Sequence, residues 1–356
     1  MTEGQMLANG IEKRFQEAGA QPFETTFLQK AGTLLDLYGE DIRARAFTTA
    51  DPLHGEMMLR PDFTVPLLLS HGTAADLPAR FSYSGTVFRR QENETSRTSE
   101  YLQVGYERFD RTYVAEADAE VFALLHDVLA PHGLSASMGD IGLLRAAVDG
   151  LKTTEPRRAA LRRHLWRPHR FRALLDRFAS QAAPTKRRFP LEESDLVSAI
   201  ERAGPAIGLR GTDDVLDRLS VLASEAEAAP LSGEEVGLID ELLSLRASPA
   251  VALGRLEDIA VNLPSVASAV SRFRARLEAI DGLGTDLGDA VFEASFGRTT
   301  LEYYDGFVFG FFASSRPDLP PVASGGRYDA LAAALGYDVA AVGGIVRPAV
   351  LAEVAV

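Results

Sequence analysis

Apolar and polar residues alternate with a period of two in four stretches of the first 110 residues, the spacing of half-buried strands. Ala46 to Thr49 and Met57 to Arg60 are separated by Asp-Pro and Gly residues that favour turns, so they predict a hairpin. Arg80 to Arg89 and Tyr101 to Phe109 are separated by an entirely polar loop and predict a second, longer antiparallel hairpin.

Helical spacing dominates elsewhere in the chain. Gly10 to Leu37 reads as two short helical stretches, and Ala115 to Leu129 as one amphipathic helix followed by a strand at Leu134 to Met138. From Gly142 to about Ile280, Leu, Ala and Arg recur at helical spacing, interrupted by prolines. This tract predicts an all-α insertion.

Strand patterns return after the helical tract. The expected elements are strands at Ala290 to Phe296, Leu301 to Tyr304 and Gly306 to Phe312, a turn-rich segment through Gly325-Gly326, a helix at Tyr328 to Leu335, and a last strand at Ala340 to Arg347. Pro348 then opens a final helix. Two blocks of antiparallel strands with segregated helices predict an α+β fold, with a core formed by 1–140 and 285–356 and a helical insertion at 141–284.

Composition excludes several classes of protein. The 356 residues contain no cysteine and six scattered histidines, so we expect no disulfide, no metal site and no resident cofactor. No apolar run is long enough for a bilayer and no signal peptide is evident, which predicts a cytoplasmic protein. A net charge of -13 argues against ordinary nucleic-acid binding.

One segment reverses that charge. Arg157 to Arg188 holds eleven Lys or Arg residues and one acid, Asp176. Such a run of basic residues usually forms the solvent-exposed face of helices. The alternative hypothesis is a positively charged surface that binds an acidic partner.

Polar and ionisable residues interrupt four otherwise apolar stretches, where burying them is costly without function. The four blocks are Leu59-Arg60-Pro61-Asp62-Phe63-Thr64; Phe88-Arg89-Arg90-Gln91 with Gln103-Val104-Gly105-Tyr106-Glu107; Leu301-Glu302-Tyr303-Tyr304 with Gly325-Gly326-Arg327-Tyr328-Asp329; and Gly343-Gly344-Ile345-Val346-Arg347. In this order they resemble the class II aminoacyl-tRNA synthetase core, specifically the histidyl-tRNA synthetase family, over most of 20–140 and 285–356.

The resemblance implies a class II synthetase-like antiparallel sheet flanked by helices, carrying an amino-acid pocket. By resemblance, Asp62, Thr64 and Gln103 face the ligand's ammonium group and Arg89 its carboxylate, while Glu107 and Tyr304 read the imidazole of histidine. Tyr303 is the seventh residue of this predicted set, and Arg97 and Arg347 are further candidates by the same resemblance. Without the resemblance, Asp62 and Thr64 would be interpreted as turn residues. Arg89 and Glu107 would be interpreted as an ion pair across two strands on an exposed face of the sheet, and the tyrosines as ordinary aromatic residues of a sheet.

The departures from the synthetase pattern concern the activation chemistry. Thr299 stands where the family has an arginine, and because Arg298 lies one residue away along an expected strand, it would point to the other face. Gln91 and Val346 replace the two glutamates that hold ATP or its metal. Adenylation is therefore expected to be lost.

Only nine residues follow Arg347, so no anticodon-binding module and no tRNA are expected. A retained pocket with lost activation groups is similar to the regulatory subunits of ATP phosphoribosyltransferase. That resemblance implies a non-catalytic, histidine-binding protein that regulates the short catalytic subunit in the first step of histidine biosynthesis, as a homodimer within a hetero-oligomer. Two alternatives stay open: a truncated synthetase-like enzyme that still adenylates an amino acid, and a synthetase-like sensor with another target.

Overall fold

The fold is described here from a computed structural model. It covers residues 2–32, 44–73, 76–91, 98–112, 114–180, 193–202, 204, 208–209, 211–298 and 303–354. A nine-stranded sheet forms its centre, with strands in the order β1 (Gln21–Pro22), β5 (Ala79–Phe88), β6 (Glu100–Asp110), β12 (Ala340–Val346), β11 (Ala323–Arg327), β10 (Phe307–Phe312), β7 (Ser135–Asp140), β9 (Val291–Glu293) and β8 (Arg246–Ala247). Every neighbour pair from β5 to β7 is antiparallel, whereas β1 pairs with β5 and β9 with β7 in parallel. The predicted α+β fold with an antiparallel sheet is confirmed.

A second, three-stranded sheet has the order β2 (Leu28–Lys30), β4 (Gly55–Leu59) and β3 (Thr48–Asp51). The β3–β4 pair is the first predicted hairpin, and Gly55 has φ 79°, a backbone conformation that glycine adopts without strain. The longer hairpin is also confirmed, since β5 and β6 pair from Ala79–Phe109 to Phe88–Glu100.

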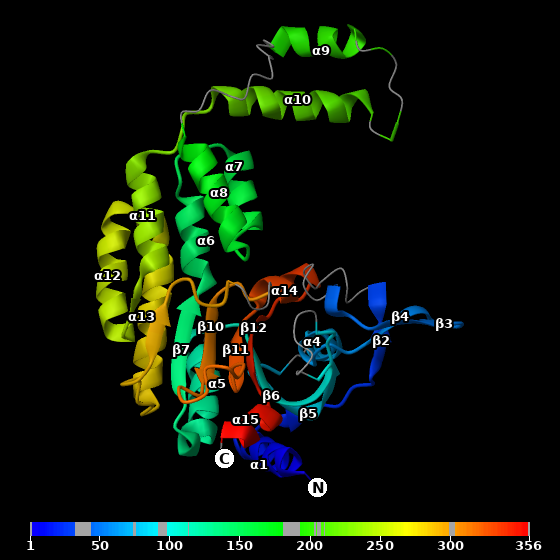
Figure 1. The fold of residues 1–356 in the computed structure, drawn as a ribbon, viewed down its shortest axis with the longest axis vertical. Helices are drawn as coiled ribbons and strands as arrows, with labels where there is room; N and C mark the ends of the chain where they lie inside the picture. Colours follow the sequence, from blue (N-terminus) through cyan, green and yellow to red (C-terminus); the bar gives the residue numbers. More distant parts are fainter. Residues whose placement is uncertain are drawn as a thin grey trace.

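Helices cover both faces of the large sheet (Figure 1). They are α1 (Glu3–Glu17), α4 (Thr64–His71), α5 (Val114–Leu129), α14 (Asp329–Ala334) and α15 (Pro348–Val354). Strand alternation separates two apolar cores: Phe307, Phe309 and Phe311 of β10 pack beneath α5, while Val308 faces the opposite side. The candidate site lies on the side of Val308.

The tract between β7 and β9 contains eight α-helices within the described residues, and it is not purely helical as predicted, because the short strand β8 lies in it and pairs with β9. They are α6 (Ile141–Asp149), α7 (Glu155–Arg163), α8 (Pro168–Ala179), α9 (Glu193–Arg202), α10 (Thr212–Glu227), α11 (Gly233–Ser244), α12 (Pro249–Asn262) and α13 (Ala267–Gly282). Helices α9 and α10 project from the body as an arm (Figure 1). One apolar core runs without interruption from α5 into α6, α8, α11, α12 and α13.

A buried ionic cluster joins this helical tract to the sheet. Asp118 on α5, with 0% exposure, accepts hydrogen bonds from Arg276 Nε on α13 at 2.8 Å and from Arg327 Nε on β11 at 2.9 Å. Arg276 also donates to Asp140 at 3.0 Å, and Arg327 to Asp329 at 2.8 Å. Because each buried charge has partners of opposite sign, the cluster is electrostatically satisfied.

Several sequence predictions at element level were wrong. Helix α1 begins at Glu3 instead of Gly10, and Leu28, predicted helical, lies in β2; residues 33–37 of that prediction lie outside the described residues. Gly325-Gly326, read as a turn, lies within β11 at the centre of the sheet. A pair of glycines in a sequence usually indicates a turn because glycine backbones are conformationally free. In this protein the two glycines are needed because they have no side chain, which leaves space for residues next to β11.

Candidate functional site

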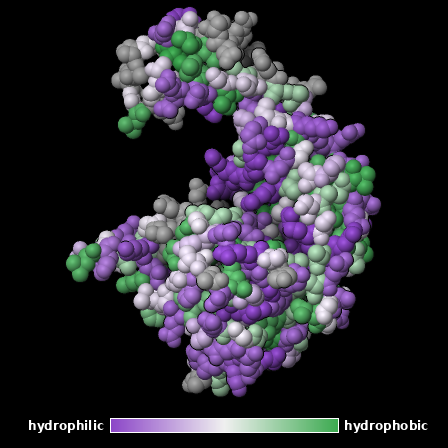
Figure 2. Space-filling model, turned by 180° about the vertical axis from the view of Figure 1, so that it is seen from behind, coloured by the Kyte–Doolittle hydropathy of each residue, from purple (hydrophilic) through white to green (hydrophobic). Residues whose placement is uncertain are grey.

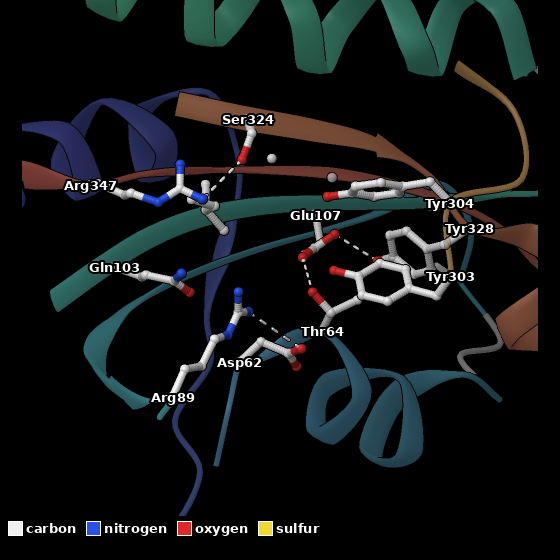
Figure 3. Close-up of a pocket in the computed structure, with 13 residues that line it drawn as sticks. Asp62, Thr64, Arg89, Gln103, Glu107, Tyr303, Tyr304, Ser324, Tyr328 and Arg347 are labelled. Atoms are coloured by element: carbon white, nitrogen blue, oxygen red, sulfur yellow. Dashed lines mark hydrogen bonds and ion pairs between the residues drawn. The ribbon is translucent and has the colours of Figure 1, made fainter. Parts of the chain in front are cut away.

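A pocket opens on the side of the sheet opposite α5, and Figure 3 shows the side chains around it. Its walls come from the segment leading into α4, from β5 and β6, from the chain just before β10, and from β11 and β12. The lining residues are Asp62, Thr64, Arg89, Gln103, Glu107, Tyr303, Tyr304, Ser324, Tyr328, Gly343, Gly344, Ile345 and Arg347. The structure thus brings together all seven principal residues predicted from the sequence, and Arg347 with them. Arg97 lies outside the described residues.

The carboxylate of Glu107, on β6, stands at the centre of this pocket and is 2% exposed. Its Oε1 accepts hydrogen bonds from the hydroxyls of Thr64 and Tyr83, both at 3.0 Å, and its Oε2 accepts one from the Tyr328 hydroxyl at 2.6 Å. Three hydroxyl donors fix its rotamer and leave acceptor capacity for one further N–H or O–H donor. The reading as an exposed cross-strand ion pair with Arg89 is wrong, because both side chains are buried and Glu107 bonds to hydroxyls.

Glycines in the neighbouring strands make room for this arrangement. Gly343 on β12 lies directly opposite Glu107, and a methyl group at Gly343 would overlap Glu107 Oε2. Gly105, two residues before Glu107, leaves space for the Tyr83 ring, which crosses over it and stacks on Phe63 with ring centroids 4.4 Å apart. The position of Glu107 therefore depends on two absent side chains as well as on three hydroxyls.

The pKa of the Glu107 carboxyl is raised to about 7, mainly by burial and to a smaller extent by the nearby Asp62 carboxylate, while the three hydroxyl bonds lower it. The group therefore titrates close to neutral pH. Such a shift in a pocket is typical of a functional carboxylate, although structural networks produce shifts too.

Asp62 and Arg89 lie together beside Glu107 (Figure 3). Asp62 Oδ2 is 3.9 Å from Arg89 Nη2, and Arg89 Nε donates to the Pro61 carbonyl at 2.8 Å. Asp62 Oδ1 accepts from the Val65 backbone N–H at 3.4 Å, at the start of α4. The Asp62 carboxylate and the Arg89 guanidinium are thus held at the pocket wall by residues 61–65, the segment for which a turn was the alternative interpretation.

Gln103 and Arg347 border the same side of the pocket as Arg89 (Figure 3). Gln103 is 1% exposed, and within the described part of the chain its Oε1 has no hydrogen-bond partner. Arg347 donates to the Pro321 carbonyl at 2.8 Å and to Ser324 Oγ at 3.3 Å. A buried amide oxygen without a donor is unfavourable unless a ligand supplies one.

Tyr303 and Tyr304, both predicted as site residues, line the pocket, although neither lies in the strand predicted for Leu301 to Tyr304. Because both precede β10 outside any strand, the rule that neighbouring side chains point to opposite faces does not apply to them. Their rings are 4.8 Å apart, and Tyr303 meets Tyr328 edge-on at 6.0 Å. Burial raises the pKa of each phenol, so both are neutral hydrogen-bonding groups.

The residues that sequence reasoning missed are mainly those that hold Glu107. Tyr328 follows the Gly325-Gly326 pair in one of the four sequence blocks, and Tyr83 lies in the strand predicted from Arg80 to Arg89. A buried carboxylate requires hydrogen-bond donors, and Tyr83, six residues before Arg89, lies in the same hairpin as Glu107. Ser324, Gly343 and Gly344 also line the pocket, whereas α4 was not predicted at all.

The positions that carry activation groups in synthetases do not present carboxylates here. Gln91 Nε2 donates to the Arg89 and Thr98 carbonyls, both at 3.3 Å, and Val346 has 0% exposure in the apolar core beneath the sheet. Arg298 lies in a turn, not a strand, and its Nε donates to the Leu165 carbonyl at 2.7 Å, away from the pocket lining. Thr299 lies outside the described residues.

Two features are absent from the described ranges of the chain. No group of three or more His, Cys, Asp or Glu side chains has a metal-binding arrangement there. None of the helices in the same ranges has the length and apolarity needed to traverse a bilayer.

Comparisons with known proteins give consistent results. The family model described as histidyl-tRNA synthetase matches residues 3–236 and 213–350. The chain is 31% identical over 350 residues to the ATP phosphoribosyltransferase regulatory subunit of Mesorhizobium japonicum, covering 93% of this chain and 91% of that protein. The subunit of the same name from Allorhizobium ampelinum is 30% identical over 352 residues, with 93% and 92% covered.

Solved structures share the fold at lower identity. An ATP phosphoribosyltransferase regulatory subunit/histidyl-tRNA synthetase from Bacillus halodurans superposes with a TM-score of 0.70 at 22% identity, covering 99% of this chain and 78% of that one. A histidyl-tRNA synthetase from Nostoc gives a TM-score of 0.64 at 15% identity, with 98% and 70% covered.

Proposed function

The chain belongs to the family of ATP phosphoribosyltransferase regulatory subunits, which are built on the histidyl-tRNA synthetase fold, and we propose that its pocket binds free histidine to regulate a short catalytic subunit. In this role it catalyses no reaction by itself. It acts as a homodimer within a cytoplasmic hetero-oligomer that performs the first step of histidine biosynthesis.

The observation that carries the proposal is the division of the pocket into two ends around Glu107. Arg89 and Gln103 lie toward one end, and the phenols of Tyr303, Tyr304 and Tyr328 toward the other (Figure 3). A zwitterion requires a guanidinium for its carboxylate and oxygen acceptors for its ammonium, and the charged end supplies both kinds of group.

Histidine is the amino acid that best uses the remaining groups. Its imidazole donates an N–H, and Glu107 retains acceptor capacity beyond its three hydroxyl bonds. The tyrosine side chains that line the pocket suit the flat imidazole ring, and Tyr304 lies near the Glu107 carboxylate. Asp62 and Gln103 then receive the ammonium; Thr64, first assigned to it, is committed to Glu107 through its hydroxyl proton but keeps lone pairs for the ligand.

A regulatory role fits better than adenylation because the ATP-holding carboxylates are replaced. Gln91 is neutral and Val346 is buried, so neither position holds a metal-nucleotide complex. Arg298 bonds to the Leu165 carbonyl instead of the pocket. In this proposal the synthetase-like core, with its helical insertion at 141–284, still binds the amino acid but no longer activates it with ATP.

Titration calorimetry with free histidine tests the pocket. Wild type should bind histidine, whereas Glu107→Gln should bind about tenfold or more weakly, since the charge-assisted acceptor for the imidazole is lost. Glu56→Gln, on the exposed strand β4, is the matched control and should bind like wild type. Absence of histidine binding by wild type would remove the proposal.

Two further measurements separate the regulatory role from its rivals. Robust histidine-dependent exchange of pyrophosphate into ATP would support a truncated synthetase. Failure to form a complex with, or to change the activity of, the short ATP phosphoribosyltransferase subunit encoded in the same genome would support a sensor for another target.

A further inference from the structure

The basic run predicted from the sequence divides in the structure into paired and available arginines. Arg157 pairs with Glu225 at 2.8 Å, Arg158 with Glu155 at 2.9 Å, Arg162 with Asp149 at 2.5 Å, and Arg172 with Asp176 at 2.9 Å. Arg157 links α7 to α10 and Arg162 links α7 to α6, while the pairs of Arg158 and Arg172 lie within α7 and α8. These four positive charges are therefore largely compensated. Reversing Arg162 would therefore disturb the helical tract itself.

Three other arginines are exposed and make no ion pair within the described part of the chain: Arg163, Arg170 and Arg177. Arg170 and Arg177 are seven residues apart on α8, so they share one helical face roughly 10 Å long, with the small, exposed Ala173 between them. Arg163 ends α7 next to the α7–α8 connection. We call these three side chains the α7–α8 basic face.

Arg163 and Arg170 both act electrostatically on His164, which lies at the end of α7. The pKa of the half-buried His164 imidazole is lowered first by burial and then by the charges of Arg167, Arg170 and Arg163. Helices α7 and α8 border the space beneath the α9–α10 arm (Figure 1), and hydrophilic side chains gather around that hollow in the view from behind (Figure 2).

The α7–α8 connection, next to Arg163, also contacts residues on the pocket side of the molecule. The Leu165 carbonyl, in the α7–α8 connection, accepts the hydrogen bond from Arg298, whose guanidinium lies 4.9 Å from the centre of the Phe171 ring. Trp166 packs against both apolar cores, including the one that contains Tyr304. The connection beside the basic face thus contacts Arg298 and the apolar core that contains Tyr304.

We propose that the α7–α8 basic face, Arg163, Arg170 and Arg177, is a docking surface for an acidic patch of the catalytic phosphoribosyltransferase subunit. The proposal rests on the proposed function and adds the place of contact. Uncompensated arginines on a chain of net charge -13 favour an acidic partner. A protein fits better than a nucleic acid, because a face of roughly 10 Å spans few phosphates and the rest of the chain repels them.

The test compares two triple charge reversals in complex formation with the co-purified short catalytic subunit, measured by calorimetry at several salt concentrations. Arg163→Glu/Arg170→Glu/Arg177→Glu should weaken the complex about tenfold or more and remove most of its salt dependence. The control, Lys13→Glu/Arg255→Glu/Arg272→Glu, carries the same charge change on other exposed helical positions and should behave like wild type.

Histidine affinity serves as the test of folding, since none of the six positions lines the pocket. If the basic-face variant does not fold, the three Arg→Gln single variants replace it and should each weaken the complex. Equal weakening by both triples, or none by either, overturns the docking surface while leaving the proposed function intact. A wild-type protein that forms no complex overturns the proposed function itself.

Discussion

Replacing Glu107 by glutamine should increase stability at alkaline pH while it reduces histidine binding. The folded protein holds the Glu107 pKa at about 7, against an ordinary value of 4.5. That difference corresponds to roughly 3 kcal/mol, the cost of keeping the carboxylate charged in its buried position. Because the side chain is 2% exposed, solvent screening does not reduce this figure much.

The direction in which stability changes with pH follows from proton binding by the folded and unfolded states. Between pH 4.5 and 7 the folded protein binds the Glu107 proton more tightly than the unfolded chain, so this residue's contribution to stability falls as pH rises through that window. Glutamine has nearly the same shape as the protonated carboxyl and does not titrate. Relative to wild type, Glu107→Gln should therefore gain roughly 2–3 kcal/mol between pH 5 and pH 8.5.

Urea unfolding of both proteins at pH 5 and pH 8.5 measures this gain, and the comparison cancels the other titrating groups. Glu56→Gln should show no such pH-dependent gap. Added histidine should stabilise wild type at pH 8.5 and have little effect on Glu107→Gln. A stability difference between wild type and Glu107→Gln that is the same at both pH values would refute the reasoning.

Three other substitutions test the surroundings of the pocket and the buried ionic cluster. Gly343→Ala should displace the Glu107 carboxylate and abolish measurable histidine binding in calorimetry, whereas Gly254→Ala, in an open position of α12, should bind normally and be more stable by about 0.5–1 kcal/mol. Asp118→Asn should lower the free energy of unfolding by about 3–5 kcal/mol in urea titrations, because two buried guanidinium groups lose their shared anion. Tyr83→Phe removes a donor to Glu107, so the pH at which stability levels off should move upward; an unchanged pH profile would contradict this.

Local patterns predicted most of the large sheet and the membership of the pocket. Alternation in β5 and β6 identified the hairpin that carries Arg89, Gln103 and Glu107, and motif order brought Asp62 and Thr64 to the same place. These predictions succeeded because strand periodicity is a local property, and because the resemblance supplied the long-range pairing that periodicity lacks.

The failures have two physical causes. Gly325 and Gly326 form part of a central strand because neighbouring side chains need their space, a tertiary effect that overrides the local turn signal. Tyr303 and Tyr304 were predicted in a strand, but neither lies in one, so both side chains can line the pocket without the alternation that a strand imposes. The hydroxyl shell of Glu107 joins three segments distant in sequence and leaves no local signature.

The ionic cluster around Asp118 affects how this fold can change during evolution. Cutting out the helices between β7 and β9 would remove the Arg276 guanidinium and leave the Asp118 and Asp140 carboxylates inside the protein with too little positive charge. A descendant that lost those helices would need compensating substitutions on α5 and at the end of β7 at the same time. We therefore expect an exchange of the helical tract between relatives to give a stable protein only where the last helix keeps an arginine that pairs with both carboxylates.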